Sequence, residues 1–263
     1  MVKIISGWSD RGGSTFAFIN LTNKLNESGI DTTFYGPHPW HLDKCKSGLL
    51  DEKFRLYEND IVITHFLNLG DRPNVKKIIL SCHEKNLFEV GKIKKYWDTV
   101  VFVNNKQREY HNQYNGPFEI IPNIKEVLEK KEKDESVKNV AGIVGSIDEN
   151  KQTHVSIERA IEDGMEKIYL FGNISDQNYY EKKVKPLIDN DKVVEYGFVS
   201  DKQKIYDMIN YAYLSSKSEV ASLVKDECES TGTIFKGNFA TNNDSESITN
   251  SEIIEKWIKL LMN

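Results

Sequence analysis

Two patterns of apolar positions recur along the chain from its first residues: short apolar runs typical of buried strands, and apolar positions at helical spacing. Residues 2–6 form a short, mainly apolar run that predicts a buried strand. A Gly-rich stretch follows at 7–14, and residues 15–28 then show apolar positions at helical spacing before Gly29. The apolar residues that share one face of this helix are Phe18, Leu21 and Leu25. The chain therefore begins with a strand, a glycine loop and a helix, the unit from which parallel α/β sheets are built.

Further short strands predict a doubly wound α/β domain over residues 1–125. These strands are expected at residues 32–35, 61–64, 77–82, 100–104 and 118–121. Several of them are apolar without interruption, as is typical of parallel strands that are covered on both faces. Helical and loop segments between the strands complete the pattern.

The pattern stops in a charged stretch and then starts again. Residues 126–139 are dominated by Lys and Glu, which is typical of a solvated connector, so we place an interdomain linker there. Strands are expected again at residues 140–144, 167–171 and 193–196, with helices between them, and they predict a second, smaller α/β domain over residues 140–248. A final amphipathic helix over residues 249–263, with Trp257 on its apolar side, is expected to pack back on the N-terminal domain.

Composition and charge narrow the possible functions. The formal net charge is −5, and no long Lys/Arg run offers an electrostatic footprint for nucleic acid. The first residues turn polar too early for a signal peptide, and no stretch reaches the apolar length of a membrane span, so we expect a cytoplasmic protein. The three cysteines have no metal-ligand spacing, and we predict no metal site.

Two glutamates eight positions apart, Glu219 and Glu227, give the strongest chemical signal. If Ser222 and Leu223 open a helix, the first backbone N–H groups, up to Val224, form an anion site. Such a site flanked by carboxylates suits a nucleotide diphosphate sugar, because the amides meet the phosphates and the carboxylates meet hydroxyls. Two glutamates at this spacing also arise by chance in a chain with 40 acidic residues.

Short motifs around these glutamates follow a recognisable order. In the second half of the chain they are Val144-Gly145-Ser146, Lys151, Leu170-Phe171-Gly172-Asn173, residues 194–199, Glu219-x7-Glu227 and residues 231–234. In the first half they are Gly12-Gly13 and residues 60–65, 79–84 and 120–123. This order resembles the retaining glycosyltransferases of GT-B fold grouped as family 4, most clearly over residues 140–236.

The resemblance implies two Rossmann-like domains that face each other across a cleft. It also implies a nucleotide-sugar co-substrate, no separate cofactor, and transfer with retention to an acceptor that could be a glycan, a lipid-linked sugar or a protein. Three residues would be catalytic: Lys151 on the donor diphosphate, Glu219 facing the transferred sugar, and His83 near that sugar. Glu227 would accept the ribose hydroxyls. The remaining donor- or acceptor-side positions are Gly12, Gly13, Gly145, Ser146, Gly172, Ser222, Leu223 and Val224.

The chain departs from the family pattern at one position and leaves other functions open. The family usually has an arginine where this chain has Ser146, so one positive charge on the leaving diphosphate is missing, for which Lys217 is a substitute candidate. A catalytically idle GT-B-like binding protein is therefore one alternative. A nicotinamide-dependent oxidoreductase is another, although Gly7, Gly12 and Gly13 do not have Gly-x-Gly-x-x-Gly spacing. Residues 189–191 read Asp-Asn-Asp, a metal signature in another glycosyltransferase fold, but their position predicts a turn.

Overall fold

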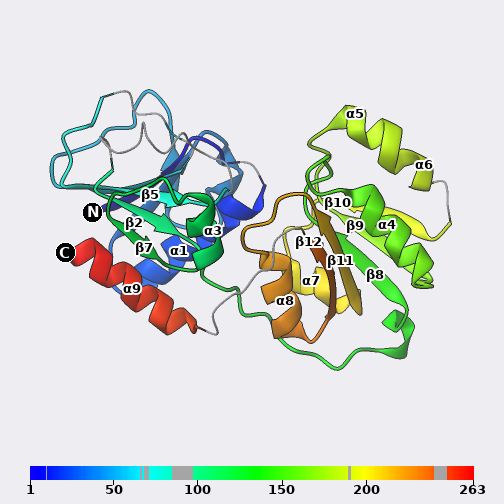
Figure 1. Ribbon diagram of the computed structural model, residues 1–263. Coiled ribbons are helices and arrows are strands. Elements are labelled where there is room, and N and C mark those ends of the chain that lie inside the picture. The colour runs from blue at the N-terminus through cyan, green and yellow to red at the C-terminus, as the bar shows by residue number, and fades with distance from the viewer. Residues whose placement is uncertain (10, 66, 68–70, 85–96, 189–190, 240–247) are drawn as a thin grey trace. The chain divides into compact units, whose positions relative to one another are not determined.

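The computed structural model describes all residues except 10, 66, 68–70, 85–96, 189–190 and 240–247. It divides into two compact units (Figure 1). Unit 1 comprises Met1–Ile124 and Asn243–Asn263, and unit 2 comprises Lys125–Asn242. Each unit is built on one parallel sheet, which confirms the predicted α/β class.

The sheet of unit 1 has the strand order β3-β2-β1-β4-β5-β6-β7, and its described pairings are parallel. Its strands are β1 (Val2–Ser6), β2 (Thr32–Gly36), β3 (Ser47–Leu49), β4 (Ile61–His65), β5 (Lys77–Cys82), β6 (Thr99–Phe102) and β7 (Phe118–Ile120). The helices among its described residues are α1 (Gly13–Glu27), the short 3-10 turn Pro39–His41, α3 (Asn105–Tyr110) and α9 (Asn250–Met262). Because successive side chains of a strand point to opposite faces, Ile4 and Ile63 pack in one buried cluster and Ile5 and Val62 in another.

The C-terminal helix α9 completes the core of unit 1. It begins with a capping box in which Thr249 and Glu252 bond each other's backbone N–H groups. Trp257 on its buried face packs in the same apolar cluster as Leu21 of α1 and the strand residues. The Lys77 ammonium also donates to the Leu260 carbonyl at 2.7 Å. The last helix therefore belongs to the fold of unit 1 although it follows unit 2 in sequence.

The sheet of unit 2 has the order β10-β9-β8-β11-β12, again with parallel pairings. Its strands are β8 (Val140–Val144), β9 (Lys167–Phe171), β10 (Val193–Gly197), β11 (Tyr211–Ser216) and β12 (Ile234–Phe239). Its helices are the 3-10 turn Glu135–Val137, α4 (Thr153–Glu162), α5 (Gln177–Tyr179), which continues through the π-helical turn Tyr180–Val184 into α6 (Lys185–Ile188), α7 (Lys202–Asp207) and α8 (Leu223–Thr231). Figure 1 shows α4, α5 and α6 on one face of this sheet and α7 and α8 on the other, so the unit is doubly wound.

The charged segment that we predicted as a linker, residues 126–139, lies along unit 2 instead. The Glu129 N–H donates to the Gln203 side chain at 2.8 Å, and Lys131 forms an ion pair with Asp207 at 2.7 Å. The Leu128 side chain packs against the apolar cluster beneath α7 and α8. The charged side chains of this segment therefore attach it to the surface of unit 2 through hydrogen bonds and ion pairs.

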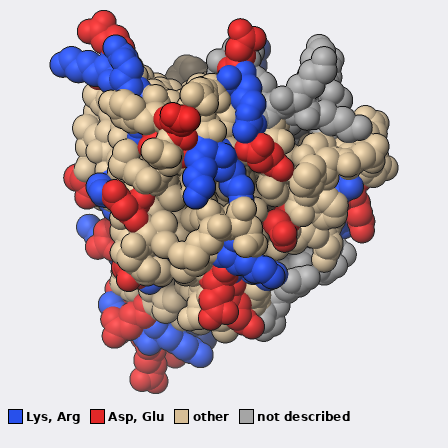
Figure 2. Space-filling view, turned by 90° about the vertical axis from the view of Figure 1, so that its left-hand side faces the viewer, with Lys and Arg blue, Asp and Glu red and all other residues tan. Residues whose placement is uncertain are grey.

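The surface carries charges of both signs. On the face shown in Figure 2, basic and acidic side chains are interspersed. Within the described residues, no helix combines the length and apolar character needed to cross a membrane.

Candidate active site

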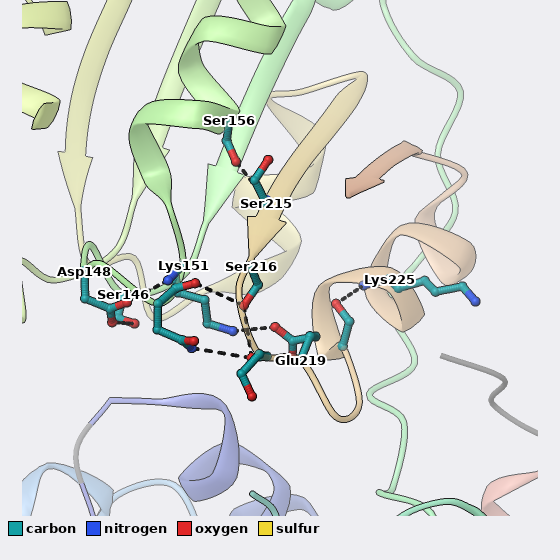
Figure 3. Close-up of polar contacts among 11 residues, drawn as sticks. Ser146, Asp148, Lys151, Ser156, Ser215, Ser216, Glu219 and Lys225 are labelled. Atoms are coloured by element: carbon teal, nitrogen blue, oxygen red, sulfur yellow. Dashed lines mark hydrogen bonds and ion pairs between the residues drawn. The ribbon is translucent and has the colours of Figure 1, made fainter. Parts of the chain in front are cut away.

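Two loops follow β8 and β11, the neighbouring central strands of the unit 2 sheet. From β8 the chain proceeds to β9 and β10 on one side of the sheet, and then returns to β11 and β12 on the other. Parallel sheets bind ligands beyond the carboxyl ends of their strands at such a reversal. Residues 145–151 follow β8 and residues 217–222 follow β11, so both candidate loops emerge at this point (Figure 3).

Gly145 and Gly172 hold the ends of β8 and β9 close together. Gly145 has a φ of 143°, which L side chains rarely adopt. A Cβ atom at Gly172 would lie 1.7 Å from the Gly145 carbonyl oxygen. Backbone packing by itself therefore requires glycine at both positions.

Asp148 organises the loop after β8. Its carboxylate accepts hydrogen bonds from the Ser146 hydroxyl at 2.6 Å, the Lys151 N–H at 2.8 Å and the Ser175 hydroxyl at 3.2 Å. Ser146 therefore bonds an acidic side chain at the position where the resembled family has a cation. Lys217, the substitute candidate, pairs with Glu149, and both side chains of that pair are about half exposed.

Lys151 and Glu219 meet across the two loops. The Lys151 Nζ lies 2.6 Å from the Glu219 Oε2, and the side chains are 26% and 10% exposed, respectively. Backbone contacts tie the same loops together, since the Lys217 N–H donates to the Asn150 carbonyl at 2.8 Å. The structure thus brings two of the predicted catalytic residues into direct contact (Figure 3).

Helix α8 begins at Leu223, where the sequence predicted a helix start. Ser222 is its N-cap, and the Ser222 hydroxyl accepts the Lys225 N–H at 3.3 Å. The backbone N–H groups of Leu223 and Val224 lie in the first turn, where the helix itself supplies no acceptor. Leu223 follows Glu219 by four positions, so the amides and the Lys151–Glu219 pair belong to one region of unit 2.

Glu227 lies further along α8 in a buried polar cluster. Its carboxylate accepts hydrogen bonds from the Lys202 ammonium at 2.5 Å and from the Tyr206 hydroxyl at 2.6 Å, and its side chain is 4% exposed. Lys202 also pairs with Glu126 at 2.7 Å. Burial disfavours the charged form of Lys202, but the Glu227 and Glu126 carboxylates outweigh that effect and raise its pKa. Burial, reinforced by the Glu227 charge, raises the pKa of Tyr206 well above its ordinary value.

His83 follows β5 in unit 1, at the edge of a small cavity. Its Nε2 lies 3.1 Å from the Ser81 hydroxyl, and its ring packs edge-on against Phe18 and against His65. The cavity is also lined by Leu21, Pro122 and Trp257. Burial lowers the pKa of His83 to about 4, so the imidazole is neutral at pH 7.

Gly12 and Gly13 also belong to unit 1, where they start α1. Gly12 is the N-cap, and its carbonyl accepts the Phe16 N–H at 3.2 Å. Gly13 is the first residue of the helix. The predicted site residues are thus divided between the units, with Gly12, Gly13 and His83 in unit 1 and the others in unit 2.

Sequence reasoning did not single out Asp148, Lys202, Tyr206 or Glu126. An acidic residue three positions before Lys151 is compatible with a capped turn, which is a weak signal for Asp148. Lys202 and Glu126 show no pattern at all, because Lys202 reaches Glu227 from a different helix and Glu126 pairs with Lys202 from the segment that precedes β8. No group of three or more His, Cys, Asp or Glu side chains suited to a metal ion occurs among the described residues. Asp189 and Asn190 of the Asp-Asn-Asp stretch lie outside that part of the chain.

Comparison with known proteins gives matches to solved structures alone. A scan of family models and a search of curated proteins returned no match. The crystal structure of Anabaena Alr3699/HepE in complex with UDP and glucose aligns with a TM-score of 0.71 at 12% identity, over 100% of this chain and 91% of that one. A glycosyltransferase from Rickettsia africae aligns with a TM-score of 0.64 at 15% identity, over 99% and 88% of the two chains. WaaG, a glycosyltransferase involved in lipopolysaccharide biosynthesis, aligns with a TM-score of 0.62 at 12% identity, over 100% and 91%.

The chain has the GT-B fold. The two parallel sheets account for this likeness, because each is a Rossmann-like domain of the kind that the GT-B fold contains in duplicate. In the GT-B fold of this chain, the Lys151–Glu219 pair lies beyond the carboxyl ends of the central strands of unit 2.

Proposed function

We propose that this protein is a glycosyltransferase that moves a sugar from a nucleotide-sugar donor, held mainly by unit 2, to an acceptor that the sequence does not identify. We further propose that it belongs to family 4, retains the anomeric configuration and works without a metal ion. The observation that carries the proposal is the Lys151–Glu219 contact of 2.6 Å at the reversal point of a GT-B sheet, with Glu219 four positions before the first residue of α8. Crystal structures of HepE with UDP and with UDP-glucose provide support from the same fold.

Each proposed role follows from the chemistry of the donor. Cleavage of the bond between the sugar and the diphosphate places negative charge on the departing phosphate. The Lys151 ammonium and the first amides of α8 stabilise that charge and lower the barrier. Glu219 accepts hydrogen bonds from hydroxyls of the transferred sugar, and Glu227 from those of the ribose. His83 is neutral at pH 7, so its proposed role near the sugar is that of a hydrogen-bond partner and not of an acid.

Retention and metal independence rest on different arguments. Retention is proposed because the order of motifs along the chain resembles a retaining family. Metal independence is proposed because Lys151 and the amides of α8 supply the charge stabilisation that a divalent ion provides in other enzymes. Ser146 provides no positive charge of its own, so Lys151 carries a larger share of that stabilisation than in a site with two cations.

Calorimetric titration with UDP, ADP, GDP and NAD tests the nucleotide part of the proposal. We expect one nucleoside diphosphate to bind, and Lys151→Met to weaken that binding by about 10- to 100-fold, the range for a hydrogen bond to a charged group. Lys138→Met is the matched control. Lys138 is 66% exposed and precedes β8, so it lies at the amino ends of the strands, whereas Lys151 lies beyond their carboxyl ends. Equal affinities for the two variants, or binding of NAD alone, would contradict the proposed site.

Turnover distinguishes an enzyme from an idle binding protein. Incubation with the sugar donor of the bound nucleotide should release nucleoside diphosphate slowly in water, because water replaces the acceptor. The rate should fall in Lys151→Met at saturating donor, since the charge on the leaving group grows in the transition state. Nucleotide binding with no donor cleavage would leave only a binding function.

A further inference from the structure

The donor site contains an internal ion pair where an anionic ligand is expected to bind. Lys151 faces Glu219 at 2.6 Å, and Glu219 is the more buried of the two side chains at 10% exposure. A diphosphate that binds Lys151 must therefore take the ammonium from a carboxylate that already neutralises it. The two loops are also held together at the Asn150 carbonyl, which accepts the Lys217 N–H at 2.8 Å and the Ser216 hydroxyl at 3.3 Å, so Glu219 stays beside the position of the phosphates when the ion pair opens.

The loops around this pair carry more acidic than basic side chains. Residues 145–151 and 216–222 include Asp148, Glu149 and Glu219 against Lys151 and Lys217. Lys217 is engaged by Glu149, and Asp148 accepts bonds from two hydroxyls and a backbone N–H. The region that would meet the phosphates thus has a negative excess, in contrast to a site with both a lysine and an arginine.

Charge distinguishes an intact donor from its nucleotide product. In a nucleotide sugar the terminal phosphate is esterified, whereas in the free nucleoside diphosphate it can lose a second proton near neutral pH. The free product therefore places additional negative charge next to Glu219. The intact donor instead offers sugar hydroxyls that can donate to the carboxylate, which compensates Glu219 for the loss of Lys151.

We propose that Glu219 is a specificity-determining residue that makes this site prefer the intact nucleotide sugar, with its esterified diphosphate, over the free nucleoside diphosphate. This inference rests on the proposed function and adds a consequence for the catalytic cycle. Cleavage converts a ligand that satisfies Glu219 into one that Glu219 repels, and the product is released more readily.

The test compares UDP, the methyl ester of UDP at its terminal phosphate, and UDP-glucose, with the ADP and GDP series run alongside. The methyl ester has the charge of a nucleotide sugar but no sugar, so the comparison does not depend on the correct sugar. In the parent protein we expect UDP to bind about tenfold more weakly than its methyl ester. Glu219→Gln should tighten UDP binding by about tenfold and bring UDP and its ester to similar affinities, while UDP-glucose gains little.

Glu135→Gln is the control, because it removes the same charge from unit 2 at a side chain that is 88% exposed and precedes β8. Unfolding midpoints of both variants show whether the fold is intact. If the parent binds none of the nucleotides in the three series, the proposed function and this inference both fail. If the parent binds UDP as tightly as its ester and Glu219→Gln changes neither affinity, the inference fails while the proposed donor site stands.

Discussion

Replacing Lys202 by methionine tests whether the cluster around Glu227 is as buried as the structure shows. Methionine keeps most of the length of the side chain and removes the charge that pairs with Glu227 at 2.5 Å. The Glu227 carboxylate would then keep the Tyr206 hydroxyl at 2.6 Å as its described donor. A buried carboxylate that loses its cation is strongly unfavourable, because neither water nor a counter-ion replaces the lost interaction.

The exposed fractions of the paired side chains set the expected loss in the free energy of unfolding. Lys202 and Glu227 side chains are 12% and 4% exposed, so their pair falls in the buried class, for which loss of one partner costs about 3–5 kcal/mol. Glu126 is 36% exposed, and its pair with Lys202 contributes at most about 1 kcal/mol. With Tyr206 still bonded, we expect Lys202→Met to lower the free energy of unfolding of unit 2 by about 3 kcal/mol. Lys202→Met combined with Glu227→Gln should recover most of that loss, since the buried charge is then gone.

Urea unfolding followed by two probes measures the effect separately in each unit. The four tryptophans, Trp8, Trp40, Trp97 and Trp257, all belong to unit 1, so their fluorescence reports that unit. Far-ultraviolet circular dichroism reports both units. The destabilisation should appear in the dichroism transition and leave the fluorescence transition unchanged.

Lys204→Met is the matched control, because Lys204 lies exposed on the same helix and should change stability by less than about 0.5 kcal/mol. A cost below about 1 kcal/mol for Lys202→Met would contradict the buried environment of this ion pair. Such a low cost would mean that Glu227 is solvated. A loss of about 3 kcal/mol that the double variant does not recover would also contradict it, because the loss would then not come from an unpaired buried carboxylate.

Three further outcomes are expected. Burial lowers the pKa of folded His83 to about 4, so the unfolded chain binds the additional proton and stability should rise from pH 4 to 6.5 by up to about 3 kcal/mol. Urea titrations at pH 5 and pH 7 should show a smaller rise for His83→Gln, and an unchanged rise would contradict the burial. Trp257→Ala should cost about 3–5 kcal/mol in thermal unfolding, because the ring is 3% exposed in the core that α9 shares with α1; an unchanged midpoint would mean that α9 is not docked. Donor cleavage should persist in EDTA, and a complete loss that manganese restores would disprove metal independence.

Local patterns in the sequence were sufficient for the α/β class and for most of the central strands. The predicted strands at 61–64, 77–82, 140–144 and 167–171 match β4, β5, β8 and β9 closely. These strands are buried on both faces, so their apolar character is continuous and independent of which strands become neighbours. The start of α8 at Leu223 was likewise readable, because Ser222 bonds the helix that immediately follows it.

Contacts between distant segments could not be read from such patterns. The three-residue strand β3 has little apolar character and was not predicted. Residues 126–139 were interpreted as a linker because charged side chains that bond to the surface of unit 2 give the same sequence pattern as charged side chains in solvent. Glu227 was visible through its spacing from Glu219, but its partner Lys202 lies 25 positions away on a different helix.

The candidate site shows the same division. Local hydrophobicity was enough to place Lys151 and Glu219 in loops that follow short apolar segments, now seen as β8 and β11. Their ion pair of 2.6 Å, between residues 68 positions apart in sequence, became visible in the folded chain alone. The two loops meet because β11 pairs beside β8 in the sheet, and that order depends on how the helices pack on both faces and not on either strand alone.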